Sequence, residues 1–493
     1  MPDAVPHQAA GGERSRSCVG ENGEHVLQLS TEITRVSAMK TGTRNTKARW
    51  LALSAVAVAS VLAMAACAGR QPNAGPPPDG GDLPPGMRGR LNIDRKVRPG
   101  ITVLLDDSVK LVAGKRVALI TNQTGVDEKG RRTVDLLFAD ERAQRAGVKL
   151  VRLFAPEHGA LGVADREGLS DEKDIKTGLT VHSLYQRTTI APPDSLLQDV
   201  DVLVVDLQDI GTRTWTYVGV VLYAMQAGER RGIPVLVLDR PNPLSGVATE
   251  GALLDSALAN AQYPTSTNRT NGFAIYPSPL RHGLTMGELA RLFQASLKLG
   301  TRLTVVPMRN WRRGMWFDDT DLPWVRPSPN MPNLTSALFY PSLVPFEASN
   351  VSVGRGTSQP FQRFGAPWLR ADSVVRLLED LSLTGVKFHA ERFTPEKPGD
   401  NKFAGRSIPG VRLELTDRER VQPARVGAAI LWAISRVHGD SLRLTLPGFD
   451  LRMGSAKLRE ALQGGADPDA VMDRLLPQVV AFEKDARRFH LYR

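Results

Sequence analysis

Four short apolar runs, each followed at once by polar residues, dominate the first half of the chain. The runs are residues 116–120, 148–154, 201–205 and 233–238, and they are rich in Val, Ile and Leu. Their length and composition predict buried β-strands. Helix-like stretches such as residues 218–230 lie between them. This alternation predicts a parallel sheet wrapped by helices.

Polar segments follow these strands at the point where each one ends. They read TNQTG at residues 121–125, PEHG at 156–159, DLQD at 206–209 and DRPNP at 239–243. Carboxyl ends of parallel strands meet at one edge of a sheet, where ligands of open α/β folds bind. The pattern therefore predicts a functional site at this edge. No Gly-x-Gly-x-x-Gly and no phosphate-binding loop follows any of the strands, which disfavours a nucleotide as the ligand.

The alternation of apolar strands and helices ends at about residue 275, and long irregular segments become more frequent. Thr285 and Glu288 have the spacing of a capping box, which predicts a helix to about residue 299. Residues 311–332 and 350–368 read as long irregular loops, a kind of segment that often binds ligands. Residues 424–438 and 456–492 read as helices. We expect an α/β fold: a Rossmann-like domain over residues 93–275, then a second, α+β domain over residues 276–493.

The beginning of the chain reads as an export signal. Basic residues precede an uncharged run, residues 50–66, which ends in LAMAA before Cys67. This is typical of a bacterial lipoprotein signal, with Cys67 as the lipidated residue, Met39 as the initiator and residues 1–67 as leader and signal peptide. A single membrane-spanning helix is the alternative. The Pro- and Gly-rich residues 68–92 predict a disordered linker from a lipid anchor, which would place the protein in the periplasm or cell envelope.

Composition narrows the possible partners. The chain has 42% hydrophobic and 23% charged residues, as expected of a globular protein. Its only cysteines are Cys18 and Cys67, so an exported body would have no disulfide and no cysteine metal site. Residues 1–67 hold seven Lys or Arg and five Asp or Glu, so their removal lowers the net charge from +11 to +9. Such a charge favours anionic partners or simply solubility, and no nucleic-acid-binding motif accompanies it.

Six motifs resemble those of the NamZ-type exo-β-N-acetylmuramidases. They are residues 120–125 (ITNQTG), 154–159 (FAPEHG), 238–243 (LDRPNP), 281–285 (RHGLT), 327–332 (PSPNMP) and 353–357 (VGRGT). The resemblance runs from about residue 98 to the end. It implies a cofactor-independent glycoside hydrolase that removes N-acetylmuramic acid from the non-reducing ends of peptidoglycan fragments. It also implies an active cleft between a Rossmann-like domain and a second domain.

Glycosidic cleavage generally requires a proton donor and a second carboxylate. We expect Glu157 to transfer the proton, with His158 orienting it or binding a sugar hydroxyl. Asp239 is the first candidate for the second carboxylate, and Asp209 and Glu250 are the reserves. Each has a structural alternative: a helix cap or a pairing with Arg240 for Glu157, a satisfied buried imidazole for His158, and a salt bridge with Arg240 or a turn for Asp239.

The remaining candidates would bind the sugar. N-acetylmuramic acid carries a lactyl carboxylate, for which Arg355 is the preferred partner and Arg281 and Arg240 are alternatives. Further contacts are expected from polar and aromatic side chains of the other motifs, each of which could instead shape a turn or fill the core: Asn122, Gln123, Arg213, Trp215, Tyr217, Asn242 and His282.

Two other classes of function remain open from the residues alone. A murein-binding lipoprotein would hold a sugar on the same polar edge without cleaving it. A metal-dependent hydrolase would be built on His158, Asp209 and His282, although no His-x-x-x-His pattern surrounds them. The identity of the second acid, the stereochemistry of hydrolysis and the oligomeric state are not encoded in these patterns.

Overall fold

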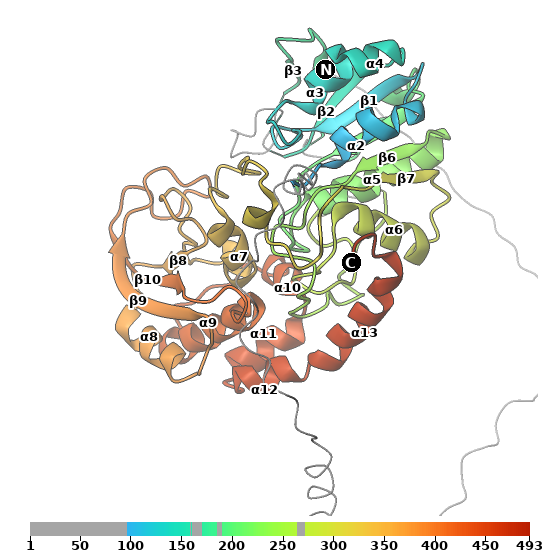
Figure 1. Ribbon diagram of the computed structural model, residues 1–493. Coiled ribbons are helices and arrows are strands. Elements are labelled where there is room, and N and C mark those ends of the chain that lie inside the picture. Colours follow the sequence, from blue (N-terminus) through green and yellow to red (C-terminus); the bar gives the residue numbers. More distant parts are fainter. Residues whose placement is uncertain (1–95, 158, 160–169, 185–189, 264–271) are drawn as a thin grey trace, which may run out of the picture. The chain divides into compact units, whose positions relative to one another are not determined.

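The computed structural model describes residues 96–157, 159, 170–184, 190–263 and 272–493 (Figure 1). Residues Ile93–Arg493 form one compact unit. The signal sequence, Cys67, the linker and His158 lie outside the described residues. No helix within the described ranges is long and apolar enough to cross a membrane.

A seven-stranded sheet forms the centre of the first domain, in the order β3-β4-β2-β1-β5-β6-β7. All neighbours pair in parallel except β3 and β4, which are antiparallel. The four strands expected from the sequence are confirmed as β1, β2, β5 and β6. The strands are β1 (Arg116–Thr121), β2 (Lys149–Ala155), β3 (Glu172–Lys173), β4 (Thr180–Ser183), β5 (Val202–Asp206), β6 (Val235–Leu238) and β7 (Leu303–Val306).

Helices cover both faces of this sheet because its strands are apolar on both sides. Val117 and Leu119 of β1 belong to one cluster of buried residues, with side chains of α2 (Gly100–Asp107), α3 (Thr133–Ala139) and α4 (Glu141–Arg145). The alternate residues Ala118 and Ile120 belong to a second cluster, with α5 (Tyr217–Arg231) and α6 (Met286–Ser296). The predicted Rossmann-like architecture is therefore confirmed.

The sheet extends beyond residue 275, where the sequence suggested a domain boundary. Strand β7 pairs with β6 throughout its length, and α6 precedes it. The run at β7 was missed because it is four residues long and its first three side chains are only partly buried. The capping box that opens α6 is present, with Thr285 accepting from the Glu288 amide and Glu288 accepting from the Thr285 amide.

The second domain contains a three-stranded antiparallel sheet in the order β8-β10-β9, as Figure 1 shows. The helices predicted over residues 456–492 are three in number and are followed by a short final turn. Gly464 and Gly465 separate the first two, and Pro468 and Pro477 lie in the first turns of the second and third. The elements are α7 (Leu334–Leu343), β8 (Arg363–Gly365), α8 (Ala371–Glu379), β9 (Val386–Phe393), β10 (Ile408–Leu415), α9 (Pro423–His438), α10 (Gly448–Met453), α11 (Ala456–Gln463), α12 (Pro468–Asp473) and α13 (Leu476–Ala486).

One hydrophobic cluster joins the two domains. It includes buried residues of β5 and α5 together with Phe339 of α7 and Ile430 of α9. A continuous core of this kind holds the elements of both domains in fixed relation, so side chains from both can build one site.

Candidate functional site

Glu157 is a half-buried carboxylate beyond the carboxyl end of β2. The hydroxyl of Thr216 donates a hydrogen bond to its Oε2 atom at 2.9 Å. Thr216 is the residue immediately before α5, so the carboxylate lies beside the amino-terminal end of a 15-residue helix. A negative charge is stabilised in that position. Glu157 therefore combines partial exposure with a fixed position, two properties expected of a catalytic carboxyl group.

The charge of Glu157 contributes to the raised pKa values of two buried tyrosines. Burial raises the pKa of Tyr217 well above its ordinary value, and the Glu157 carboxylate raises it further. Burial likewise raises the pKa of Tyr340, with added contributions first from Glu347 and then from Glu157. Tyr340 belongs to α7 of the second domain. The carboxylates of Glu157 and Glu347 thus act on the same phenol group, one from each domain.

Glu347 is a candidate that the sequence analysis missed. It lies in a short 3-10 helix, Val344–Ala348, and its side chain is 17% exposed. Arg355 donates to its Oε1 atom at 2.9 Å, and Nε of Arg452 lies 3.8 Å from its Oε2 atom. The sequence offered one clue to Glu347, because this residue lies just upstream of the motif at residues 353–357. A single acid in an irregular segment has no periodic pattern that would identify it as functional.

Lys402 fixes the segment that carries Glu347. Its ammonium group donates to the carbonyl oxygens of Phe346, Glu347 and Val351 at 3.2, 2.9 and 3.0 Å. Burial lowers the pKa of Lys402. Three backbone bonds to one ammonium hold this irregular stretch in place, which gives Glu347 and its partner Arg355 a defined geometry.

Arg355, the expected partner of the lactyl carboxylate, is paired with Glu347. Its contact with Glu347 means that a lactyl carboxylate would have to share the guanidinium with that acid. A guanidinium has five N–H donors, so sharing is possible. Arg355 is accordingly placed both to bind an anionic substrate group and to stabilise the charge of Glu347.

Asn122 and Tyr217 are interior residues that connect loops. The Asn122 amide donates to the Tyr217 hydroxyl at 2.7 Å, and that hydroxyl donates to the carbonyl oxygen of Pro327 at 2.8 Å. Both side chains are buried, which corrects the expectation that they contact sugar. Gln123, half-buried, donates to the carbonyl oxygen of Arg326 at 2.8 Å. Together these bonds attach the loop at residues 327–332 to the edge of the sheet.

Arg240 pairs with Asp206, not with Glu157 or Asp239. The Nη2 atom of Arg240 lies 2.9 Å from Oδ2 of Asp206, Nε contacts Oδ1, and Nη2 also donates to the Val126 carbonyl oxygen at 2.7 Å. The two side chains are 4% and 1% exposed. This buried fork leaves Arg240 unable to bind a substrate carboxylate, and its role is structural.

Asp239 is sealed in the interior. Its oxygens accept hydrogen bonds from the hydroxyls of Thr285 and Tyr492 at 2.7 and 2.6 Å, from the Gly287 amide at 2.8 Å and from the Arg240 amide at 3.1 Å. The residue is 0% exposed. Its carboxylate holds the start of α6 and the end of the chain, so the structure corrects its expected role as second catalytic acid.

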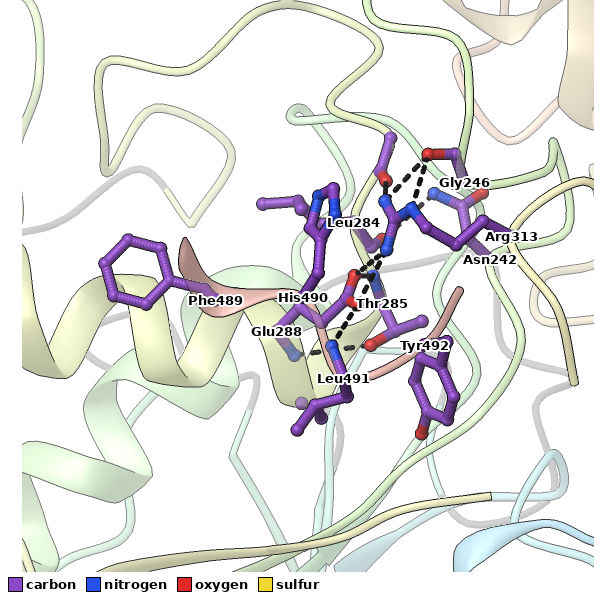
Figure 2. A network of polar contacts seen from close by, with 12 residues as sticks. Asn242, Gly246, Leu284, Thr285, Glu288, Arg313, Phe489, His490, Leu491 and Tyr492 are labelled. Atoms are coloured by element: carbon purple, nitrogen blue, oxygen red, sulfur yellow. Dashed lines mark hydrogen bonds and ion pairs between the residues drawn. The ribbon is translucent and has the colours of Figure 1, made fainter. Parts of the chain in front are cut away.

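The chain terminus is part of the same buried network, as Figure 2 shows. Arg313 donates to both carboxylate oxygens of Glu288 at 2.7 and 2.9 Å, and the Leu491 amide donates to Glu288 Oε1 at 2.8 Å. Glu288 therefore attaches both Arg313 and the end of the chain to α6.

Replacing Asp239 by asparagine is expected to remove one component of the pH dependence of stability. Burial raises the pKa of Asp239 from 3.8 to about 6, despite its hydrogen bonds to Tyr492, Gly287 and Thr285. The folded state then binds this proton more tightly, so its contribution to stability is full below pH 4 and declines as the pH rises to 6. The decline is on the order of 3 kcal/mol at 1.36 kcal/mol per pKa unit.

The measurement is urea unfolding of wild-type and Asp239→Asn proteins between pH 4 and pH 7. The variant is expected to lack this decline, because an amide does not titrate and the two hydroxyls can reverse their bonds. Exposed Asp372, replaced in the same way, provides the control. Parallel curves for wild type and Asp239→Asn would contradict the prediction.

Asp209 and His282 form a buried pair. Nε2 of His282 lies 3.2 Å from Oδ2 of Asp209, and Nδ1 accepts from the Leu284 amide at 3.1 Å, which assigns the proton to Nε2. Asn242 donates to the Leu284 carbonyl oxygen at 2.9 Å. All three side chains are buried, and His282 also lines a cavity of about 240 Å³. Their expected contacts with a ligand stay predictions. Within the described residues, no three His, Cys, Asp or Glu side chains are grouped to hold a metal.

Arg213 connects the two domains from the interior. Its guanidinium donates to the carbonyl oxygens of Leu451 and Arg452 at 3.0 Å each, at the end of α10. Burial lowers its pKa to about 9. Neighbouring Trp215 is 7% exposed and packs edge-on against Tyr217 and Tyr340. Neither side chain can meet a sugar as expected.

Glu250 and Arg281 pair with each other, with Nη1 of Arg281 3.2 Å from Oε1 of Glu250. Burial raises the pKa of Glu250. Both line a cavity of about 290 Å³ next to α13. The expected roles of Glu250 as reserve acid and Arg281 as carboxylate partner stay predictions.

Comparison with known proteins identifies relatives over most of the chain. Residues 117–335 match the model of the N-terminal part of the exo-β-N-acetylmuramidase NamZ family, and residues 338–492 match its C-terminal part. The peptidoglycan β-N-acetylmuramidase NamZ of Bacillus subtilis (strain 168) is 37% identical over 399 residues, which is 80% of this chain and 92% of that protein.

Two solved structures share the fold. Both are DUF1343 family proteins from Bacteroides fragilis. One has a TM-score of 0.71 and 31% identity, covering 81% of this chain and 99% of its own. The other has a TM-score of 0.63 and 28% identity, covering 80% of this chain and 99% of its own. The fold and the arrangement of domains are thus those of previously observed proteins.

Proposed function

Since the chain belongs to the family of NamZ exo-β-N-acetylmuramidases, we propose that it hydrolyses the bond between a non-reducing terminal N-acetylmuramic acid and the rest of a peptidoglycan fragment. The observation that carries this proposal is the half-buried Glu157, held by Thr216 at the end of β2. Glycosidases of most families use two carboxyl groups. Glu347 of the second domain supplies the other one.

The proposed division of labour follows from the surroundings of the two acids. Glu157 donates the proton to the leaving oxygen. Glu347 forms ion pairs with the cationic Arg355 and Arg452. An ionised carboxylate suits the role of activating water or attacking the anomeric carbon.

The direct test is hydrolysis by residues 93–493, the compact unit of the chain. A nitrophenyl β-N-acetylmuramide and a disaccharide of N-acetylmuramic acid and N-acetylglucosamine serve as substrates. Release of nitrophenol and of free N-acetylmuramic acid is expected. Tight binding of the disaccharide with no release, beside an active relative, would favour a sugar-binding protein instead.

Arg355→Ala is expected to impair muramic acid substrates selectively. A hydrogen bond from a charged donor typically contributes about 1.5–3 kcal/mol, so kcat/KM for the muramide should fall roughly 10- to 150-fold. The corresponding N-acetylglucosaminide, which lacks the lactyl carboxylate, should lose much less. Steady-state kinetics on both substrates measures this ratio.

The control is Arg376→Ala, which removes an exposed arginine of α8. An equal loss on both substrates would assign Arg355 to the support of Glu347 alone. The selectivity, rather than the size of the loss, is therefore the informative quantity.

The proposal extends to location. The uncharged run before Cys67 supports export and attachment of lipid to that cysteine, with residues 68–92 as the linker. Labelling of the full chain with radioactive palmitate in bacterial cells is the measurement. Label that persists in Cys67→Ser would contradict the lipid anchor.

A further inference from the structure

Thr216 occupies a helix-capping position but does not cap its helix. Threonine before a helix normally accepts a hydrogen bond from a backbone amide of the first turn. Thr216 makes no such bond, and its φ and ψ of −62° and −20° are helical rather than extended. Its hydroxyl instead donates to Oε2 of Glu157 at 2.9 Å.

The other helices make this exception informative. Among α-helices of the described ranges that follow Ser, Thr, Asp or Asn, all the others use that side chain as a cap. They are α4 after Asp140, α6 after Thr285, α7 after Asn333, α11 after Ser455 and α12 after Asp467. Within this group, only α5 lacks the capping hydrogen bond from a backbone amide to the side chain before the helix. Local rules of this kind are most often broken at functional sites.

The position of Thr216 is fixed by its neighbour. Tyr217 begins α5, is 0% exposed, and is bound through its hydroxyl to Asn122 and to the Pro327 carbonyl oxygen. A residue attached to so rigid a neighbour presents its hydroxyl in one place. The oxygen it contacts is consequently held in one orientation.

We propose that Thr216 is a positioning residue for the hydrolytic reaction, which orients the Glu157 carboxyl group and sets its affinity for the proton. This inference rests on the proposed role of Glu157 as proton donor. A donor to a carboxylate favours its ionised form, so loss of the hydroxyl makes Glu157 bind its proton more tightly.

Several other titratable or charged groups belong to the surroundings of the Glu157 carboxyl group, and a substitution at Thr216 leaves them unchanged. The Glu157 carboxylate contributes to the raised pKa of both Tyr217 of α5 and Tyr340 of α7. Glu347, paired with Arg355 and Arg452, contributes to the raised pKa of the same Tyr340. Because none of these is altered by a change at Thr216, a displaced pH profile reports the loss of the Thr216 hydroxyl.

The test compares Thr216→Val with Thr216→Ser, using the disaccharide as substrate from pH 4 to pH 9. Valine keeps the β-branched shape and removes the hydroxyl. We expect kcat to fall about 10- to 100-fold and KM to change less than about twofold. The alkaline limb of kcat, set by the proton donor, should move up by about one pH unit. Serine should restore both quantities.

Thr285→Val is the matched control, because Thr285 caps α6 by the side-chain bond that Thr216 does not make. It should lower the melting temperature and leave the alkaline limb unchanged. If Thr216→Val does not fold, Thr216→Ala replaces it in the same comparison.

The outcomes separate this inference from the proposed function. An inactive Glu157→Gln beside a Thr216→Val enzyme with unchanged kcat and pH profile would overturn the role of Thr216 and leave Glu157 as proton donor. A fully active Glu157→Gln would overturn both. A lower melting temperature in Thr216→Val with an unchanged pH profile would reduce Thr216 to a structural residue.

Discussion

Glu157→Gln is expected to lower kcat for the disaccharide by two to four orders of magnitude, the usual contribution of general acid–base catalysis. Glutamine preserves the size of the side chain and can still accept the Thr216 hydrogen bond. It cannot deliver a proton to the leaving sugar. The loss therefore reports the chemistry of the carboxyl group rather than its packing.

A leaving group that needs no proton should reduce this loss. Nitrophenol departs as a stable anion, so Glu157→Gln should be impaired much less on the nitrophenyl muramide than on the disaccharide. Glu141→Gln, at an exposed position of α4, is the control and should match wild type on both. Disaccharide hydrolysis within tenfold of wild type would remove Glu157 from the role of proton donor.

The edge of the sheet was predictable because its signal is local. A short run of Val, Ile and Leu that ends in polar residues identifies both a buried strand and the place where a parallel sheet binds ligands. Strands β1, β2, β5 and β6 follow this pattern, and Glu157 comes directly after one of them. The resemblance of the motifs to one family then supplied the chemistry.

The side chains that face the interior could not be distinguished from those that face a substrate. Asp239 comes directly after a strand, and Glu157 comes two residues after another. Asp239, however, is hydrogen-bonded by Tyr492, which lies more than 200 residues later in the chain. Arg240 likewise forms its salt bridge with Asp206 rather than with the adjacent Asp239. Such pairings depend on tertiary packing between distant segments, which a local polar pattern does not encode.

Glu347 shows the opposite failure, because a functional candidate carried no local signal. It lies in an irregular segment that Lys402 holds from 55 residues away. Its link to Glu157 passes through Tyr340 of α7, whose pKa both carboxylates raise. We expected the second acid at the sheet edge, whereas the second acid that we propose, Glu347, lies in the second domain.

Glu347→Gln is accordingly expected to lower kcat by at least two orders of magnitude on both substrates. The second carboxylate assists the sugar carbon or the attacking water, so its loss is not relieved by a better leaving group. Equal impairment on the disaccharide and on the nitrophenyl muramide is the expected signature. It contrasts with the unequal impairment of Glu157→Gln, and the pair of variants assigns the two roles.

The fold should survive this change, because glutamine can still accept from Arg355 and Lys402 binds only backbone oxygens in the segment. Exposed Glu379 of α8, replaced by glutamine, is the control in the same domain. Melting temperatures of both variants are measured beside the kinetics. A folded Glu347→Gln enzyme with wild-type turnover would exclude Glu347, and the search for the second acid would then turn to the other carboxyl groups near Glu157.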